Sequence, residues 1–469
     1  MRNQLSYLLL VLTVVSCGTS KNWESEQDKN SFSASFEEFN GNEKIEIEED
    51  SNKVVYLSYL TENKEGDFSI KINRDDFKYE NSKIVHFKTD LKKPLQIGIK
   101  GSSAQGKFQI EYPVYNKKKI KVQYNANFEL LSLAYFLSNM YEDLKGNNNS
   151  FNYDGKEVSV KDLFALNLKI GNRFENHLDS ENLKILNEFF EKQWYLEYTN
   201  FVVLLPELPH TEISKRSYSQ ELFKSEQEEA RFIVALNNFQ KEIRFEEFLE
   251  EYATFYNNMI EEVETNLPNE AFIAEMEHLY GKEAHAYFLN ASLTMPFSQG
   301  YAISRKDNIG YVFGALSLPI ELEDLNNLSL GYANSKQLRN LSVHEFGHSF
   351  VNPVIDQVGD SVINKKDFLF EPIQQEMSDQ GYTTWKIALY EHFVRAGEIF
   401  IARQLGDQNN ADKLSKDYIQ NRHFIYLNQI IVNLENWYNN EYFTKTYEDF
   451  VIETIAKLSL EPAIAGNNR

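Results

Sequence analysis

Residues 341–353 read LSVHEFGHSFVNP, and in this stretch the residue types and their spacing name a chemistry. The pattern is H-E-x-x-H, in which His344 and His348 are four residues apart and Glu345 follows the first histidine. On an α-helix, residues four apart lie about 40° from each other around the axis and about 6 Å apart along it, so both imidazoles can face one ion. Glu345 then faces a neighbouring direction, within reach of a water at the metal. The stretch predicts the active-site helix of a zinc-dependent hydrolase.

The ends of this helix are also predictable. Asn334 and Ser335 offer an N-cap for a helix that runs from about Lys336 to Val351. Pro353 is expected to end the helix, because a proline pushes the residue before it out of the helical region.

A catalytic zinc usually has three protein ligands and a fourth position for water, so a third ligand is needed. No histidine follows His348 at a short spacing, which points to a carboxylate on a later helix. The best such helix runs from about Thr383 to Leu405, and Glu391 lies on it away from the main apolar stripe. A carboxylate among apolar neighbours needs a partner, and zinc would supply one. The residues that remain as alternatives are Glu398, Glu376, His392 and Glu371.

Two further roles can be assigned only by residue type. Arg395 follows Glu391 by one helical turn, and we expect it either to orient that carboxylate or to form an ordinary i,i+4 ion pair. Peptide hydrolysis also needs a donor for the developing oxyanion. His423 and Tyr426, expected on a late helix, are the candidates, with core packing as the alternative role for each.

The chain begins with an export signal. Arg2 is followed by a mostly apolar run over residues 5–15, which is too short to span a hydrocarbon core of about 30 Å. The sequence VVSC at residues 14–17 resembles a bacterial lipoprotein box, and Cys17 is the only cysteine of the chain. By that resemblance residues 1–17 hold the signal, and Cys17 becomes a lipid anchor that keeps the protein exported and membrane-attached in the cell envelope, facing the periplasm or the cell surface. An ordinary secretory signal is the alternative.

The remaining chain falls into segments of different character. Residues 18–42 are polar and are expected to form a tether. Short alternating runs recur over residues 43–124 and predict a β-sandwich-like accessory domain. Helical periodicity dominates residues 125–283, a small sheet and the signature helix are expected within 284–353, and further helices follow in 354–469.

The small sheet is expected to provide the place where a substrate lies. Residues 287–293, 300–304 and 310–315 read as strands, with a hairpin turn at Asp307 and Asn308. We expect residues 311–315 to be an exposed edge strand on which an extended peptide pairs by β-addition.

Composition limits the classes of partner. A chain of 469 residues is long for one core and suggests two or three domains. The formal net charge is -22, and a strongly acidic surface repels both nucleic acid and anionic membrane surfaces. We therefore expect no nucleic-acid partner, and a peptide or protein as the substrate.

The motifs together resemble those of a known class of enzymes. HEFGHSFVNP at residues 344–353 resembles the signature of gluzincin-type zinc metallopeptidases. With YEHFVRA at residues 390–396 it is more closely similar to a family of bacterial envelope proteins known only as a domain of unknown function. The resemblance covers about residues 125–460 and implies an α+β multidomain protein with a zincin-like, mainly helical peptidase domain at 125–469 and a Zn²⁺ cofactor. Glu391 lies 391 minus 348, or 43, positions after His348, a longer separation than in gluzincin aminopeptidases.

A function of another class stays open at this point. The protein is then a non-catalytic envelope lipoprotein that binds peptide or glycan through its β domain, and the zinc site is structural or vestigial. Glu345 distinguishes the two hypotheses, because a purely structural zinc site has no need for a carboxylate between its histidines.

Overall fold

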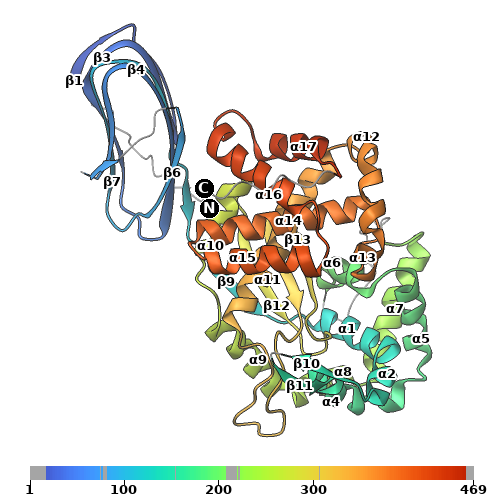
Figure 1. The fold of residues 1–469 in the computed structure, drawn as a ribbon. Coiled ribbons are helices and arrows are strands. Elements are labelled where there is room, and N and C mark those ends of the chain that lie inside the picture. Colours follow the sequence, from blue (N-terminus) through green and yellow to red (C-terminus); the bar gives the residue numbers. More distant parts are fainter. Residues whose placement is uncertain are drawn as a thin grey trace. The chain divides into compact units, whose positions relative to one another are not determined.

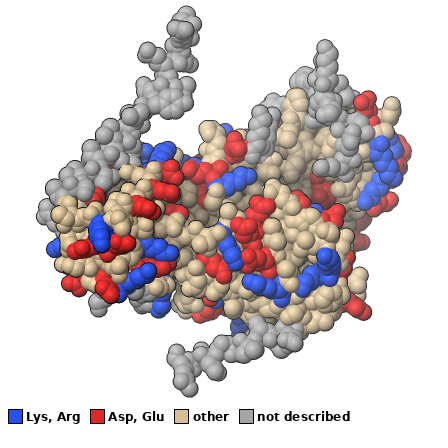
Figure 2. Space-filling view, turned by 90° about the horizontal axis from the view of Figure 1, so that it is seen from above, with Lys and Arg blue, Asp and Glu red and all other residues tan. Residues whose placement is uncertain are grey.

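The computed structural model describes residues 17–73, 75–77, 82–153, 155–206, 219, 222–305 and 307–460. An antiparallel multi-stranded sheet is followed by a mainly helical part that contains a small mixed sheet, as the sequence predicted (Figure 1). Within these ranges, no helix has both the length and the apolar character to cross a membrane. On the face drawn in Figure 2, acidic side chains lie interspersed with basic ones, so the charge of -22 forms no single acidic patch there.

The described residues form two compact units. The first unit comprises those of Met1–Lys118, Ala271–Glu283 and Pro353–Arg469, and the second those of Lys119–Glu270 and Ala284–Asn352. Each unit is therefore assembled from segments that are far apart in the sequence.

The first unit contains an eight-stranded antiparallel sheet with the order β1-β3-β7-β4-β5, in which β2 pairs with β3 and both β6 and β8 pair with β4 (Figure 1, blue). Its long strands are β3, β4 and β7, and each bends where the register shifts, as between Phe36 and Phe39 in β3. Residues from both halves of these strands bury in one core, which gives the sandwich-like character. The strands are β1 (Cys17–Lys21), β2 (Glu24–Asp28), β3 (Ser31–Ile47), β4 (Lys53–Ile72), β5 (Asp75–Phe77), β6 (Ile84–Asp90), β7 (Leu95–Glu111) and β8 (Val114–Asn116).

Two predicted boundaries of this β region were wrong. Residues 18–42 form no tether but lie largely in β1, β2 and β3, where Phe32, Ala34 and Phe36 alternate with polar residues and face the core. The polar composition of the segment had hidden this alternation. The last predicted strand of the accessory domain is β9 (Ile120–Gln123), which instead pairs in parallel with β12 in the second unit. Residues 1–16, where the export signal is predicted, lie outside the described residues.

The first unit also contains the late helices. Thr384 caps the long helix α14 by accepting a hydrogen bond from the backbone N–H of Ile387. Helix α14 packs against α15 and α16, and nearly all of its side chains from Glu391 to Ala402 are buried. The helices are α10 (Ala271–Tyr280), α13 (Gln374–Asp379), α14 (Trp385–Gln404), α15 (Gln408–Lys416), α16 (Leu427–Asn436) and α17 (Tyr447–Lys457).

The second unit contains a four-stranded mixed sheet with the order β13-β14-β12-β9. The strands are β12 (Ala286–Ala291), β13 (Gly300–Arg305) and β14 (Asn308–Phe313), together with β9. Strand β14 lies between β12 and β13, so the prediction that residues 311–315 form an exposed edge was wrong. The outer strand on that side of the sheet is β13, which forms an antiparallel hairpin with β14. Helices α1 (Ala126–Asn139), α5 (Glu181–Lys192), α7 (Glu226–Glu242) and α9 (Ala253–Thr265) belong to the same unit.

The signature helix is α11 (Ser335–Gln357). As predicted, Asn334 caps it, since its Oδ1 accepts from the backbone N–H of Gln337 at 3.0 Å. Phe346 packs between Tyr287 of β12 and Tyr311 of β14, which seats the helix on the sheet. The helix does not end at Asn352 as predicted but continues through Pro353 to Gln357.

Pro353 is tolerated inside α11 because it destabilises only the adjacent turn of the helix. Pro353 removes one backbone donor from the helix, while the turn that follows it is stabilised by other contacts. Ile355 is fully buried, and the carboxylate of Asp356 lies 2.7 Å from Lys386 Nζ and also accepts from the hydroxyl of Tyr390.

Candidate metal centre

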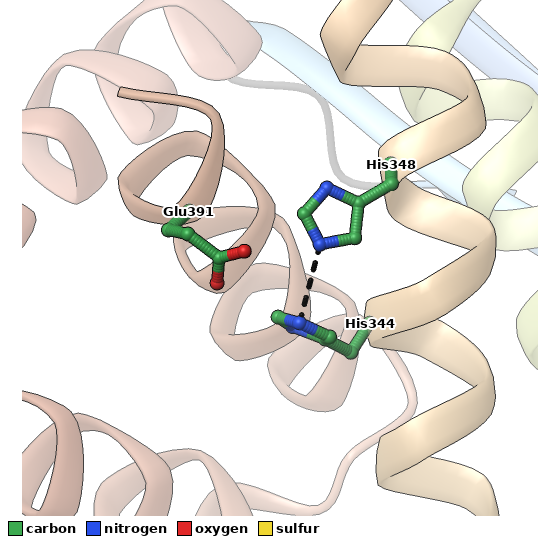
Figure 3. A group of neighbouring side chains, drawn as sticks. All are labelled: His344, His348 and Glu391. Atoms are coloured by element: carbon green, nitrogen blue, oxygen red, sulfur yellow. Dashed lines mark hydrogen bonds between the residues drawn. The ribbon is translucent and has the colours of Figure 1, made fainter. Parts of the chain in front are cut away.

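The two signature histidines face each other on α11. Their Nε2 atoms lie 3.3 Å apart, and both side chains are half-buried (Figure 3). Two nitrogens at about 2.05 Å from a tetrahedral zinc are separated by about 3.3 Å, because that is the edge of the tetrahedron. The spacing of His344 and His348 thus suits two ligands of one ion.

Asn352 determines which nitrogen of His348 is available. Its Oδ1 lies 3.2 Å from Nδ1 of His348, one turn along the helix. An amide oxygen only accepts, so Nδ1 carries the proton and Nε2 keeps its lone pair for a metal. This partner lies inside the quoted motif, but the sequence analysis assigned it only to the end of the helix.

Glu391 belongs to the same group of side chains. One ligand atom from each of Glu391, His344 and His348 lies within 4.8 Å of the others (Figure 3). Glu391 is 7% exposed, and its Oε2 accepts from Arg395 Nη2 at 2.8 Å. This contact is the i,i+4 ion pair that the spacing of Glu391 and Arg395 predicted. Among the residues that the structure describes, this is the only such group of three potential ligands.

The position of α14 is tied to the end of α11 by contacts within the first unit. Tyr390 and Lys386 of α14 both bond to Asp356, which lies eight residues after His348 on the signature helix. Eight helical residues correspond to about 12 Å along the axis. Glu391 is the next residue after Tyr390 on α14.

The alternative ligands lie elsewhere. Glu398 accepts from the hydroxyl of Tyr418 at 2.8 Å and lies 3.9 Å from Arg395. His392 is fully buried, with Nδ1 2.7 Å from the carbonyl oxygen of Ala388. Glu371 is an exposed residue of the 3₁₀ helix Glu371–Ile373, and Glu376 is half-buried in α13.

Glu345 lies against the edge of the sheet. Glu345 is 6% exposed, and a Cβ added to Gly300 would lie 2.7 Å from Glu345 Oε1. Gly300 is the first residue of β13, so the carboxylate approaches the backbone at the start of the terminal strand. The next residue, Tyr301, donates its hydroxyl to Glu197 at 2.9 Å.

His423 and Tyr426 are placed in the turn between the π-helix Asp417–Asn421 and α16, rather than on a helix. Tyr426 is buried and donates its hydroxyl to the carbonyl oxygen of Leu369 at 2.6 Å, which accounts for its proton. His423 is exposed and adopts a left-handed backbone with φ of 59°.

A tyrosine that the sequence analysis did not single out lies beside the Glu391 carboxylate. The hydroxyl of Tyr382 accepts from Arg395 Nη2 at 3.0 Å and from Arg422 Nη2 at 3.3 Å. These partners are 13 and 40 residues away in the chain, so no local pattern marks them.

The fold and the site define a class, namely an α+β protein that carries an H-E-x-x-H helix and a buried glutamate on a later helix as a possible two-histidine, one-carboxylate centre. Residues 120–457 match the family described as Domain of unknown function (DUF4932), and the chain belongs to this family. Comparison with curated proteins gave no match, and comparison with solved structures gave none either. The family match begins at β9, a few residues before the start at about residue 125 that the sequence resemblance indicated, and it leaves out the eight-stranded sheet.

Proposed function

We propose that this protein is a zinc-dependent peptidase of gluzincin type, with His344, His348 and Glu391 as the metal ligands. The observation that carries the proposal is the 3.3 Å separation of the two Nε2 atoms, with the Glu345 carboxylate on the adjacent helical position against β13. Two imidazoles and one carboxylate are the ligand set of many catalytic zinc sites, and they leave a position for water.

Two of the three ligands in this proposal, His348 and Glu391, have a partner that orients them. Asn352 holds the proton on Nδ1 of His348, and Arg395 holds one oxygen of Glu391. Partners of this kind are typical of functional sites, because they reduce the entropy lost when the ion binds.

In the proposed reaction, the zinc ion and the side chain of Glu345 have separate roles. Zinc, when bound, would lower the pKa of water to about 7 and polarise the scissile carbonyl. Glu345 takes a proton from the attacking water as the bond to the carbonyl carbon forms. It then delivers that proton to the leaving nitrogen as the C–N bond breaks, a contribution on the order of 10²- to 10⁴-fold.

The substrate in this proposal pairs with β13. This strand ends the sheet, and its first residue adjoins the carboxylate of Glu345. An extended peptide that adds to this edge by backbone hydrogen bonds would bring a carbonyl group to the general base. The exposed indole of Trp194, whose ring lies 6.4 Å from that of Tyr301, offers an apolar surface for a substrate side chain.

The proposal includes the predicted export signal, which would take the protein out of the cytoplasm. Lipidation of Cys17 would leave the mature chain anchored at its first residue, in the cell envelope. Metabolic labelling with a fatty acid tests this step, since Cys17→Ser should abolish incorporation while the unchanged chain takes up label.

The peptidase proposal is tested by zinc content and one substitution. Purified protein should contain close to one zinc per chain by elemental analysis, and His348→Ala should lose it. Glu345→Gln should keep the zinc and cleave a peptide library on the order of 10²- to 10⁴-fold more slowly. Glu264→Gln, an exposed carboxylate on α9, is the matched control and should cleave normally. Protein without zinc, or a Glu345→Gln variant as fast as the unchanged protein, would refute the proposal.

A further inference from the structure

The outer backbone edge of β13 has one side-chain partner. In an antiparallel pair, residues that turn their N–H and C=O toward the neighbouring strand alternate with residues that turn them away. The N–H of Ser304 donates to Oδ1 of Asn200 at 3.2 Å, so it points away from β14. Ala302 and Gly300 precede Ser304 at alternate positions of β13, and they therefore direct their backbone N–H and C=O to the same outer side.

The segment that carries this asparagine is fixed against β13. Asn200 belongs to the short helix α6 (Thr199–Val203), which packs against the strand. Directly before α6, the 3₁₀ helix Tyr195–Tyr198 carries Glu197, and its carboxylate accepts from the hydroxyl of Tyr301 at 2.9 Å. Two side-chain hydrogen bonds, one from each of these helices, therefore join the segment to the same strand.

The Asn200 side chain takes the place of a strand partner. In a sheet, the acceptor for such an N–H is the backbone carbonyl oxygen of the next strand, at about 2.9 Å. Here the amide oxygen of Asn200 is the acceptor, so an added peptide cannot bring its own carbonyl oxygen to the N–H of Ser304. Among the residues that the structure describes, no other side chain bonds to this backbone edge, which leaves Ala302 and Gly300 for pairing.

The other end of the edge adjoins the general base of the proposed reaction. Gly300 begins β13, and a Cβ added to it would lie 2.7 Å from Glu345 Oε1. A strand rises about 3.4 Å per residue, so the end closed at Ser304 is about 14 Å from Gly300. All of these residues belong to the second unit, and the signature histidines do as well. The distance from the closed end to the base is therefore determined within one unit.

We propose that this edge binds the N-terminal end of a peptide and that Asn200 determines how many residues precede the cleaved bond. The inference rests on the proposed peptidase function and names its substrate class. Antiparallel pairing is the more stable kind per residue, and an antiparallel peptide runs from the closed end toward Glu345. The residues before the scissile carbonyl then lie opposite Ile303, Ala302 and Tyr301. This is space for about two or three residues, so the protein releases di- and tripeptides from a free N-terminus.

The first test uses the zinc-loaded full chain and a decapeptide library in three forms. One form has both ends free, and the other two are joined to a folded carrier domain at the N-terminus or at the C-terminus. The free and the C-terminally joined peptides should lose di- and tripeptides from the N-terminus, as identified by mass spectrometry. The N-terminally joined peptides should be cleaved at least about tenfold more slowly, because the carrier would clash with α6. Equal cleavage of all three forms, or first cuts elsewhere in the free peptides, would overturn the inference and leave the peptidase function standing.

The second test changes the residue that closes the edge. Asn200→Ala removes the acceptor and frees the N–H of Ser304 for a peptide, so about two more residues fit before the cleaved bond. Tetra- and pentapeptides should then appear among the N-terminal products. Asn200→Asp is the matched control, because it keeps an oxygen acceptor on a side chain of the same length, and it should release the same short products as the unchanged protein. Identical products from Asn200→Ala and the unchanged protein would overturn the role of Asn200.

A measurement without cleavage separates the inference from the function on which it rests. Amide hydrogen exchange, resolved to single residues by mass spectrometry, is followed in zinc-loaded Glu345→Gln with and without the free decapeptides. The peptides should slow exchange at the N–H of Ala302 and leave that of Ser304 unchanged, because Asn200 already protects it. This pattern in a protein that cleaves nothing would refute the peptidase function and still support the closed peptide-binding edge. Slowed exchange at Ser304, or unchanged exchange at Ala302, would overturn the inference at any level of activity.

Discussion

Asn352 places its side-chain oxygen 3.2 Å from Nδ1 of His348, one turn further along α11 and immediately before the proline inside the helix. In the proposed metal site, the ring nitrogen that would bind the ion is thereby kept unprotonated by a residue of the same helix. The orientation of the His348 ring therefore depends on a contact within α11, and it is kept as long as this helix is folded.

Replacing Asn352 should weaken zinc binding without unfolding the helix. In Asn352→Ala the ring of His348 loses its orienting acceptor, and we expect zinc affinity to fall about 10- to 100-fold, as measured by competition with a chromogenic chelator. Gln337→Ala, an exposed position near the start of α11, is the control and should bind zinc normally. Unchanged affinity in Asn352→Ala would show that the amide does not orient the ring.

Arg395 should be essential for the stability of the zinc-free protein. It is 3% exposed and lies between the buried carboxylates of Glu391 and Glu398. Arg395→Met would remove the cation that lies between these two buried carboxylates, and we expect a loss of about 3–5 kcal/mol in the free energy of unfolding by urea. Saturating zinc should reduce this loss, because the ion offsets the charge of Glu391.

The control for this variant lies on the same helix. Arg403 of α14 pairs with Glu435, but both side chains are partly exposed, at 27% and 40%. Arg403→Met should therefore cost no more than about 1 kcal/mol. If both variants lose the same stability, the buried pair contributes nothing beyond a surface ion pair.

Gly300 should control the position of the general base. A methyl group at this position would lie 2.7 Å from Glu345 Oε1, so Gly300→Ala must displace the carboxylate. A displacement on the order of 1 Å can cost about 10²-fold in rate, and we expect this loss in kcat/KM with zinc content unchanged. Gly146→Ala, where an added Cβ has no neighbour within 4 Å, should leave activity unchanged. Full activity in Gly300→Ala would place the working position of Glu345 away from β13.

The first unit should lose stability in mild acid. Burial lowers the pKa of His278 to about 3 and that of His86 to about 4, and His278 stacks on Tyr56 with ring centroids 4.3 Å apart. In the unfolded chain both rings bind a proton below about pH 6.5. The unfolded state therefore holds more protons between about pH 6.5 and pH 4, and the free energy of unfolding falls as the pH is lowered through this range.

His278→Phe tests this dependence. Nδ1 of His278 has no hydrogen-bond partner among the described residues, so an apolar ring of similar size should be accepted in its place. The slope of the unfolding free energy against pH should become shallower by up to one proton between pH 6.5 and pH 4, measured by urea denaturation. An unchanged slope would show that His278 is already protonated in the folded protein.

Features that depend on residues close together in the sequence could be predicted, whereas features that depend on contacts between distant residues could not. The cap at Asn334 and the facing pair His344 and His348 follow from helical periodicity, and the structure has both. The third ligand could be narrowed to five candidates, of which Glu391 was the first. A carboxylate on a buried face of a helix needs a partner, and this favoured Glu391. The end of α11 was wrong because Pro353 weighs against a helix locally, while contacts of Ile355 and Asp356 sustain it.

The β region shows the same limit. Residues 31–36 alternate correctly for a strand, yet the polar composition around them favoured a tether. The strand at 311–315 was recognised, but whether it forms an edge depends on which strands pair with it, and β13 covers it. Strand β9 was assigned to the wrong sheet for the same reason, since strand pairing joins residues far apart in the chain.

By itself, the sequence determined the features that lie within one or two turns of helix: the two histidines, the glutamate between them and the cap that begins α11. It also determined the family, because HEFGHSFVNP and YEHFVRA are local strings. Only the tertiary structure decided that Glu391 joins the histidines, that β13 meets Glu345, and that Tyr382 receives two arginines from 13 and 40 residues away. The physical reason is that side-chain periodicity is set by the backbone of one element, whereas the convergence of ligands and donors is set by how separate elements pack.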